Sequence, residues 1–248
     1  MMSAKHVSKM RKTYLVRFLY RSIVLVALIL LCIFRPESAK IIQGTDLFAD
    51  FHPTHLFLYF LWGVWMFDMI FQIIPSKRLF AMGSQKVFRR NYSPCRSSEG
   101  IDRRALRRRY TKEGLKVWCF WGPLTLVLAL TWFLWLKPLG AYWFPLLFVG
   151  VFYVCDLICV LFWCPFRVWM MKNRCCTTCR IFNWDHFMMF TPFLFIPGVY
   201  SWSLAGLTAV IFIIWEIQVY LHPERFSDAY NQTLRCKNCT DRLCNRHK

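Results

Sequence analysis

Long apolar runs separated by basic segments constrain the fold of this chain more than any other feature of its sequence. A helix needs about 20 predominantly apolar residues to cross the hydrocarbon core of a bilayer. Six runs approach or reach this length, and they are expected to form helices near residues 14–34, 56–74, 118–136, 141–163, 181–200 and 202–221. With 57% hydrophobic residues, the chain is more apolar than an ordinary soluble domain. The sequence therefore predicts an all-α, polytopic membrane helical bundle of about six transmembrane helices.

The first run is interrupted by two arginines near its start. Arg17 and Arg21 leave only residues 22–34 uninterrupted, which is shorter than a spanning helix requires, so both side chains must reach back toward the headgroups. A cleaved signal peptide is an alternative interpretation of such a segment. Residues 35–40 lack a clear small-x-small cleavage site, and the run is therefore interpreted as the first helix of the bundle.

The distribution of Lys and Arg predicts the orientation of these helices. The chain has 32 Lys and Arg against 13 Asp and Glu, and cytoplasmic loops of membrane proteins keep a positive excess. With six helices and both termini cytoplasmic, 29 of the 32 basic residues lie on the inner side, and only Arg35, Lys40 and Lys137 lie on the outer side. We therefore predict a multi-pass protein of the cell membrane, with a transmembrane domain over residues 1–222, a basic cytoplasmic loop over 76–117 and a cytoplasmic Cys-rich tail over 223–248.

Two C-x-x-C pairs lie on the predicted cytoplasmic side. Cys176 and Cys179 precede the fifth run, and Cys236 and Cys239 follow the sixth. Cytoplasmic thiols stay reduced, and this spacing lets one turn of backbone present two thiolates to a single ion. We therefore predict a four-cysteine metal site, with zinc favoured, that joins the entry of the fifth helix to the tail. The glycine that usually follows the second cysteine of a zinc knuckle is absent from both pairs.

Further cysteines near these pairs leave other interpretations open. Cys164, Cys175 and Cys244 supply more thiols than one zinc ion needs, and four thiolates in an apolar setting also hold iron–sulfur clusters. A redox-active dithiol is a third interpretation. The cysteines inside the apolar runs are expected to pack as small hydrophobic residues; they are Cys32, Cys119, Cys155 and Cys159.

Five ionisable residues interrupt the predicted spans, each at a cost of about 3 kcal/mol on insertion scales. All lie in the half nearer the cytoplasm, and they are Asp68, Asp156, Asp185, His186 and Glu216. We favour ion pairs with Arg17, Arg21 and Arg167, because interior charges in membrane bundles usually meet a partner. The alternative is a polar cavity that opens inward, in which Asp185, His186 and Glu216 are the candidate catalytic, ligand-binding or proton-handling groups.

These features support three hypotheses of function. The first is a binding or scaffold protein, in which metal fixes the tail and the basic loop engages anionic lipid headgroups or a protein partner. The second is a membrane redox or electron-transfer protein that uses an iron–sulfur cluster or dithiol near Asp185 and His186. The third is a transporter that uses the intramembrane carboxylates of Asp68, Asp156 and Glu216. No nucleic-acid-binding, nucleotide-binding, hydrolase or metalloprotease signature is present, which argues against nucleic acid as a partner and leaves any reaction unassigned.

Overall fold

The structure is a computed structural model of the chain, and it describes residues 9–44, 52–74, 82–95, 100, 102–173 and 175–239. Every regular element in these ranges is a helix, and the β pairing among them is an isolated bridge between Pro94 and Asn231. The prediction of an all-α fold is therefore confirmed for the described part of the chain.

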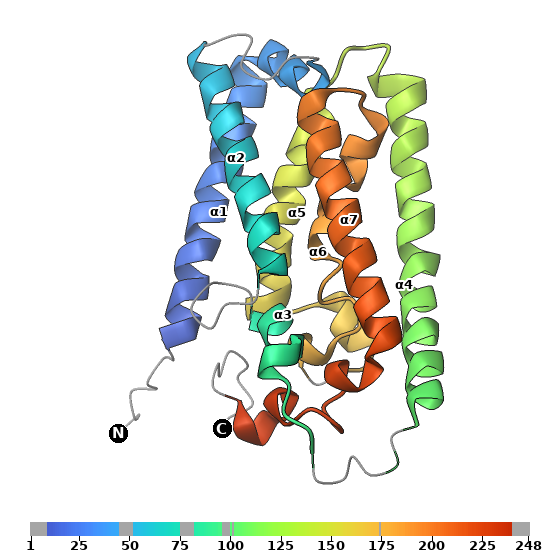
Figure 1. The fold of residues 1–248 in the computed structure, drawn as a ribbon. Helices are drawn as coiled ribbons and strands as arrows, with labels where there is room; N and C mark the ends of the chain where they lie inside the picture. Colours follow the sequence, from blue (N-terminus) through green and yellow to red (C-terminus); the bar gives the residue numbers. More distant parts are fainter. Residues whose placement is uncertain are drawn as a thin grey trace.

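Five helices are long and apolar enough to cross a membrane. They are α1 (Lys9–Phe34), α2 (Pro53–Ile73), α4 (Arg103–Thr131), α5 (Trp143–Leu161) and α7 (Val199–Leu221). The π-helical turns of η4 (Trp132–Leu136) extend α4 without a break. These helices run side by side as one bundle (Figure 1). Together they indicate a membrane protein.

The outer surface of the bundle carries large apolar side chains, as expected of helices that face lipid. Val16 of α1, Phe60 of α2, Leu126 of α4 and Ile213 of α7 are all exposed. The interior is filled by aromatic rings around Trp65, which is only 1% exposed. Its indole meets the rings of Tyr153, Phe190 and Phe193 edge to face, so that α2 and α5 are packed against the segment between α5 and α7.

That segment corrects the prediction of a continuous helix over residues 181–200. The α-helix α6 covers only Asp185–Phe190, and a 3-10 helix, η7 (Thr191–Phe195), follows it. Pro192 cannot continue the α-helical hydrogen-bond ladder, and Pro197 and Gly198 end the segment before α7 begins. In Figure 1 the segment lies inside the bundle, between α5 and α7.

The connection into α7 depends on a glycine at a close approach of two backbones. A Cβ atom at Gly198 would lie 2.5 Å from the carbonyl oxygen of Ile42. This contact packs the start of α7 against the 3-10 helix η1 (Pro36–Gln43). The backbone N–H of Val199 donates to the carbonyl oxygen of Gly44 at 2.9 Å, and the Ser201 hydroxyl donates to Ile42 at 2.8 Å.

More than half of the segment predicted as the basic loop is helical, which is a second correction. Helix α4 begins at Arg103, where the Asp102 carboxylate accepts the backbone N–H of Ala105 at 2.9 Å. Its first turns bury Leu106 and Tyr110, while the arginines of residues 103–109 point mostly outward. Two shorter helices, α3 (Met82–Val87) and η2 (Arg89–Asn91), precede it. We call the end of the bundle where α1 and α4 begin and α7 ends the basic end.

Candidate functional site

A buried arginine holds three helices together in the half of the bundle near the basic end. Arg21 of α1 is 6% exposed, and its guanidinium donates to the carboxylate of Asp156 in α5 at 2.7 Å and to that of Asp68 in α2 at 3.1 Å. It also donates to the backbone carbonyl of Tyr153 and lies 4.0 Å from the centre of that ring. The predicted pairing of these two carboxylates with an arginine is therefore confirmed. Because Arg21 is central to this cluster, α1 is an integral part of the bundle.

The imidazole of His186 extends this charged cluster toward α6. Its Nε2 lies 3.6 Å from an Asp68 carboxylate oxygen, and its Nδ1 lies 3.0 Å from Asp185. Gln72 contacts both His186 and Asp185. Its Nε2 atom lies 2.6 Å from His186 Nδ1 and 3.1 Å from an Asp185 carboxylate oxygen. His186 is buried between two carboxylates, so Asp185 and His186 belong to one network with Arg21.

Glu216 belongs to a different cluster. Its carboxylate accepts a hydrogen bond from Arg180 and another from the indole N–H of Trp184 at 2.8 Å. The Arg180 guanidinium also lies over the Trp184 ring. The three candidate catalytic residues therefore belong to two clusters. Glu216 links α7 to residues 180–184, whereas Asp185 and His186 lie in the cluster that contains Arg21. Arg180 was not expected as its partner, although its sequence position next to Cys179 puts it at the same depth.

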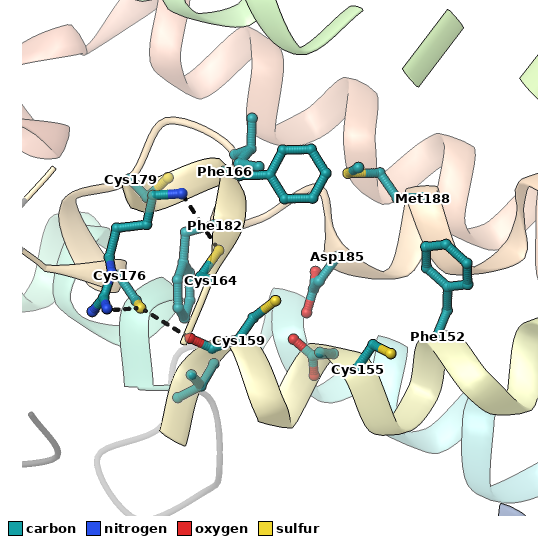
Figure 2. Close-up of a pocket in the computed structure, with 14 residues that line it drawn as sticks. Phe152, Cys155, Cys159, Cys164, Phe166, Cys176, Cys179, Phe182, Asp185 and Met188 are labelled. Carbon is teal, nitrogen blue, oxygen red and sulfur yellow. Dashed lines mark hydrogen bonds between the residues drawn. The ribbon is translucent and has the colours of Figure 1, made fainter. Parts of the chain in front are cut away.

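Five cysteines line one cavity of about 140 Å³ near the basic end (Figure 2). They are Cys155 and Cys159 of α5, together with Cys164, Cys176 and Cys179 from the chain that follows α5. Most other lining side chains are apolar, and Asp156, Asp185 and Arg167 bring charge to the wall. Cys155 and Cys159, which the sequence predicts to pack as small hydrophobic residues, are half-buried and also border this cavity. Their i, i+4 spacing was the available signal, because it places two thiols on one face of a helix.

Cys164 is the thiol of this cavity that ionises most readily. The Cys159 thiol donates a hydrogen bond to its sulfur, and this is the main cause that lowers the pKa of Cys164 to about 6. Burial opposes the shift, while the backbone N–H groups of Phe166 and Arg167 and the Arg167 charge favour it. The Arg167 N–H lies 3.5 Å from the Cys164 sulfur. A thiolate is the nucleophilic form of cysteine, so Cys164 is the candidate nucleophile of the cavity.

The neighbouring thiols stay protonated. Burial raises the pKa of Cys176 to about 11 and that of Cys179 to about 12. The Cys176 thiol donates to the backbone carbonyl of Cys159 at 3.5 Å, and its sulfur accepts from the Arg167 guanidinium at 3.6 Å. The Arg167 Nε atom is buried and makes no hydrogen bond to any described residue. Among the described residues, the cavity thus combines a cysteine of lowered pKa, several protonated thiols and a guanidinium that donates to the Cys176 sulfur.

The two C-x-x-C pairs adopt the same local structure. Each forms a single 3-10 turn, η6 (Cys176–Thr178) and η10 (Cys236–Asn238), in which the second cysteine N–H donates to the first cysteine carbonyl at 2.9 and 3.1 Å. Helix α3 packs against η6, and the Lys86 carbonyl in α3 accepts hydrogen bonds from Asn231 and Thr233 of the tail.

The structure does not gather the four cysteines of the predicted metal site into one ligand set. Cys179 is buried at the cavity, whereas Cys236 is exposed on the tail. Cys175, a possible extra ligand, is half-buried, and Cys244 lies outside the described residues. Across the described ranges, no three His, Cys, Asp or Glu side chains are arranged so as to hold one metal ion. Zinc and an iron–sulfur cluster therefore stay predictions.

Comparison with known proteins adds no family to this description. No protein-family model matches the chain, and no curated protein or solved structure is similar to it. The fold and the site by themselves define a helical protein of the membrane-spanning type with a cysteine-lined cavity near one end of its bundle.

Proposed function

We propose that the chain crosses the bilayer six times and that its basic end faces the cytoplasm. Five spanning helices alone would place the start of α1 and the end of α7 on opposite sides, yet both lie at the same end in Figure 1. The segment from Asp185 to Gly198 supplies the further crossing. Non-helical backbone is tolerated at membrane depth where protein surrounds it, and Phe190, Phe193 and Ile196 are at most 1% exposed. The basic arginines of α4 then lie on the inner side and could contact anionic lipid headgroups.

The cysteine-lined cavity is the functional centre of the protein, and its function is thiol-based redox chemistry. The observation that carries this proposal is a cavity bordered by five cysteine side chains, in which the Cys164 sulfur accepts the backbone N–H of Arg167 at 3.5 Å and Cys159 lies nearby (Figure 2). Cysteines that only fill space are packed against other side chains and are inert. Here five cysteines line one cavity, and Cys164 among them ionises most readily.

The charged residues support a redox protein better than a transporter. A transport path needs carboxylates that an ion or proton can reach in sequence. Asp68 and Asp156 are both bound to Arg21, and Glu216 is bound to Arg180 in a separate cluster. These ion pairs fasten helices to one another, which is the usual role of paired charges inside a membrane bundle.

The redox function is tested by equilibrating the protein in lipid nanodiscs with defined ratios of reduced and oxidised dithiothreitol. We expect one reversible disulfide among the five cavity cysteines, counted by alkylation and mass spectrometry. Cys32, buried in α1 away from the cavity, is the control and stays reduced. Cys236 reports the orientation, because an impermeant maleimide should label it only from the cytoplasmic side of sealed vesicles. Cavity thiols that all stay reduced in the oxidised couple would refute the proposal.

A structural metal site is the second candidate, and the shared 3-10 turn of the two C-x-x-C pairs favours it. A tail that closes onto η6 would complete four thiolate ligands, and structural zinc would then stabilise the fold. Cys176→Ser or Cys239→Ser is expected to remove the metal, whereas Cys32→Ser leaves it in place. Elemental mass spectrometry of the purified variants makes this measurement, and visible absorbance separates iron–sulfur from zinc. Unchanged metal content in Cys239→Ser would contradict a shared site.

A further inference from the structure

We infer that Cys164 is the attacking thiolate and Cys159 the resolving thiol of a site that exchanges with small, uncharged disulfides. This inference rests on the redox function proposed above and adds the roles of two residues and the class of substrate. It follows from the local backbone, from the size of the cavity and from the low polarity of its wall.

The end of α5 brings the two sulfurs together. After Leu161 the chain leaves the helix, and the backbone N–H groups of Phe162 and Trp163 both donate to the carbonyl oxygen of Ile158, at 2.9 and 3.1 Å. This tight turn reverses the chain, so that Cys164 returns to the side of α5 that carries Cys159 (Figure 2). There the Cys164 sulfur accepts the backbone N–H of Arg167 at 3.5 Å, and the Cys159 thiol, on the same wall of the cavity, favours the thiolate form of Cys164. Two cysteines five residues apart are thereby placed as an attacking and a resolving pair.

The size of the cavity limits what can reach these sulfurs. Its volume of about 140 Å³ is close to that of engineered cavities of about 150 Å³ that bind benzene. The wall includes Phe152, Phe166 and Phe182, which favour an aromatic ring or a short aliphatic group. The cavity therefore accepts one half of a small disulfide and excludes a disulfide held within a folded protein.

The low polarity of the wall favours an uncharged substrate. Asp156 and Asp185 both line the cavity, but Asp156 is already paired with Arg21 and Asp185 lies 3.0 Å from His186. The Cys164 thiolate offsets the positive charge of Arg167, whose backbone N–H its sulfur accepts at 3.5 Å. An anionic disulfide would have to give up its hydration in this mostly apolar cavity, whereas a neutral one meets mostly aromatic and aliphatic side chains.

The exchange needs no further reactant. The Cys164 thiolate attacks one sulfur of the substrate disulfide, forms a mixed disulfide and releases the other half as a thiolate. The Cys159 thiol then loses its proton to that thiolate and attacks the Cys164 sulfur. This second step breaks the mixed disulfide, forms the Cys159–Cys164 disulfide and releases the second half of the substrate as a thiolate, which takes a proton from water. One disulfide is reduced to two thiols while two protein thiols are oxidised.

The probe for this reaction is 4,4′-dithiodipyridine, a neutral disulfide of two aromatic rings. Each half that is released is measured by its absorbance. The full chain in nanodiscs is used on a Cys155→Ser background, where residues 138–167 contain no cysteine except Cys159 and Cys164. We expect a rapid release of two equivalents and a Cys159–Cys164 disulfide in the mass spectrum. Cys159→Ser should stop at one equivalent with the mixed disulfide trapped on Cys164, and Cys164→Ser should lose the rapid phase. The dianionic analogue 5,5′-dithiobis(2-nitrobenzoate) should react at least tenfold more slowly.

The outcomes separate this inference from the redox function itself. A rapid disulfide between Cys176 and Cys179 instead would overturn the assigned roles but leave a redox cavity. Two equivalents released from Cys159→Ser would also overturn them, because the resolving thiol would then lie elsewhere. Equal rates with the neutral and the anionic probe would refute the assigned substrate class. Cys119 is exposed on the outer face of α4. If Cys119→Ser lost the rapid phase, the signal would not come from the cavity.

Discussion

Replacing Arg21 by alanine is expected to destabilise the bundle by about 3 kcal/mol, at the lower end of the range for breaking a buried ion pair. The variant leaves Asp68 and Asp156 without their shared partner while both remain mostly buried, with side chains 29% and 19% exposed. Their partial exposure places the effect at the lower end of the range. It corresponds to a fall of about 6–12 °C in the midpoint of thermal unfolding for a chain of this size.

Intrinsic tryptophan fluorescence in detergent measures the unfolding of Arg21→Ala. The matched control is Arg104→Ala, which removes an exposed arginine from α4 and should change stability by no more than about 0.5 kcal/mol. A second variant that adds Asp68→Asn and Asp156→Asn to Arg21→Met should recover much of the loss, because it removes the uncompensated charges. Equal midpoints for Arg21→Ala and Arg104→Ala would show that the cluster does not hold the three helices together.

Hydropathy predicted most of the helices but not the interior segment between α5 and α7. Residues 181–200 are as apolar as a spanning helix, so a count of apolar residues places a helix there. Pro192 and the Pro197–Gly198 pair interrupt it, and the buried packing of Phe190 and Phe193 stabilises the shorter elements. Such packing depends on neighbouring helices, which a single run of sequence does not reveal.

The early start of α4 was hidden by its charge. Residues 103–117 carry many arginines and lysines, a composition typical of a cytoplasmic loop. Leu106, Tyr110 and Gly114 recur at helical spacing within it, and all three are buried. This spacing predicts the extension of the helix, because the buried positions lie on one helical face.

The charged cluster was predictable and the cysteine cavity was not. Opposite charges at the same depth of a bundle must find one another, so the pairing of Asp68 and Asp156 followed from their positions and the cost of an unpaired charge. The cavity depends on where α5 ends and on the turn that returns Cys164 to it. The C-x-x-C spacing predicts a functional role for Cys176 and Cys179. Cys159 has no such spacing, and its apolar surroundings are typical of a packing residue.

The rate of alkylation of Cys164 is expected to depend on pH in a way that no ordinary thiol would show. With a pKa of about 6 against an ordinary value of 9.0, about a tenth of Cys164 is thiolate at pH 5, roughly a thousandfold more than for the same residue in the unfolded chain. A thiolate of lower pKa is also a weaker nucleophile, and a slope of about 0.45 makes it roughly 20-fold slower over this interval. Native Cys164 should therefore react about 40-fold faster at pH 5, with the two rates crossing at roughly pH 7.7 and the unfolded chain faster above that.

Mass spectrometry of iodoacetamide-treated protein gives the rate at Cys164 in the native and guanidinium-unfolded states. Restricted access to the cavity lowers the native rate by the same factor at every pH, so the midpoint near pH 6 survives even where the crossing shifts. Cys159→Ala removes the thiol that donates to the Cys164 sulfur, and the midpoint should then move upward toward the ordinary value. Cys155→Ala, which alters the same cavity wall without touching this hydrogen bond, should leave the midpoint unchanged. A native profile that rises to pH 9 like that of the unfolded chain would contradict a thiolate at Cys164, since the hydrogen bonds that hold the charge would then contribute nothing.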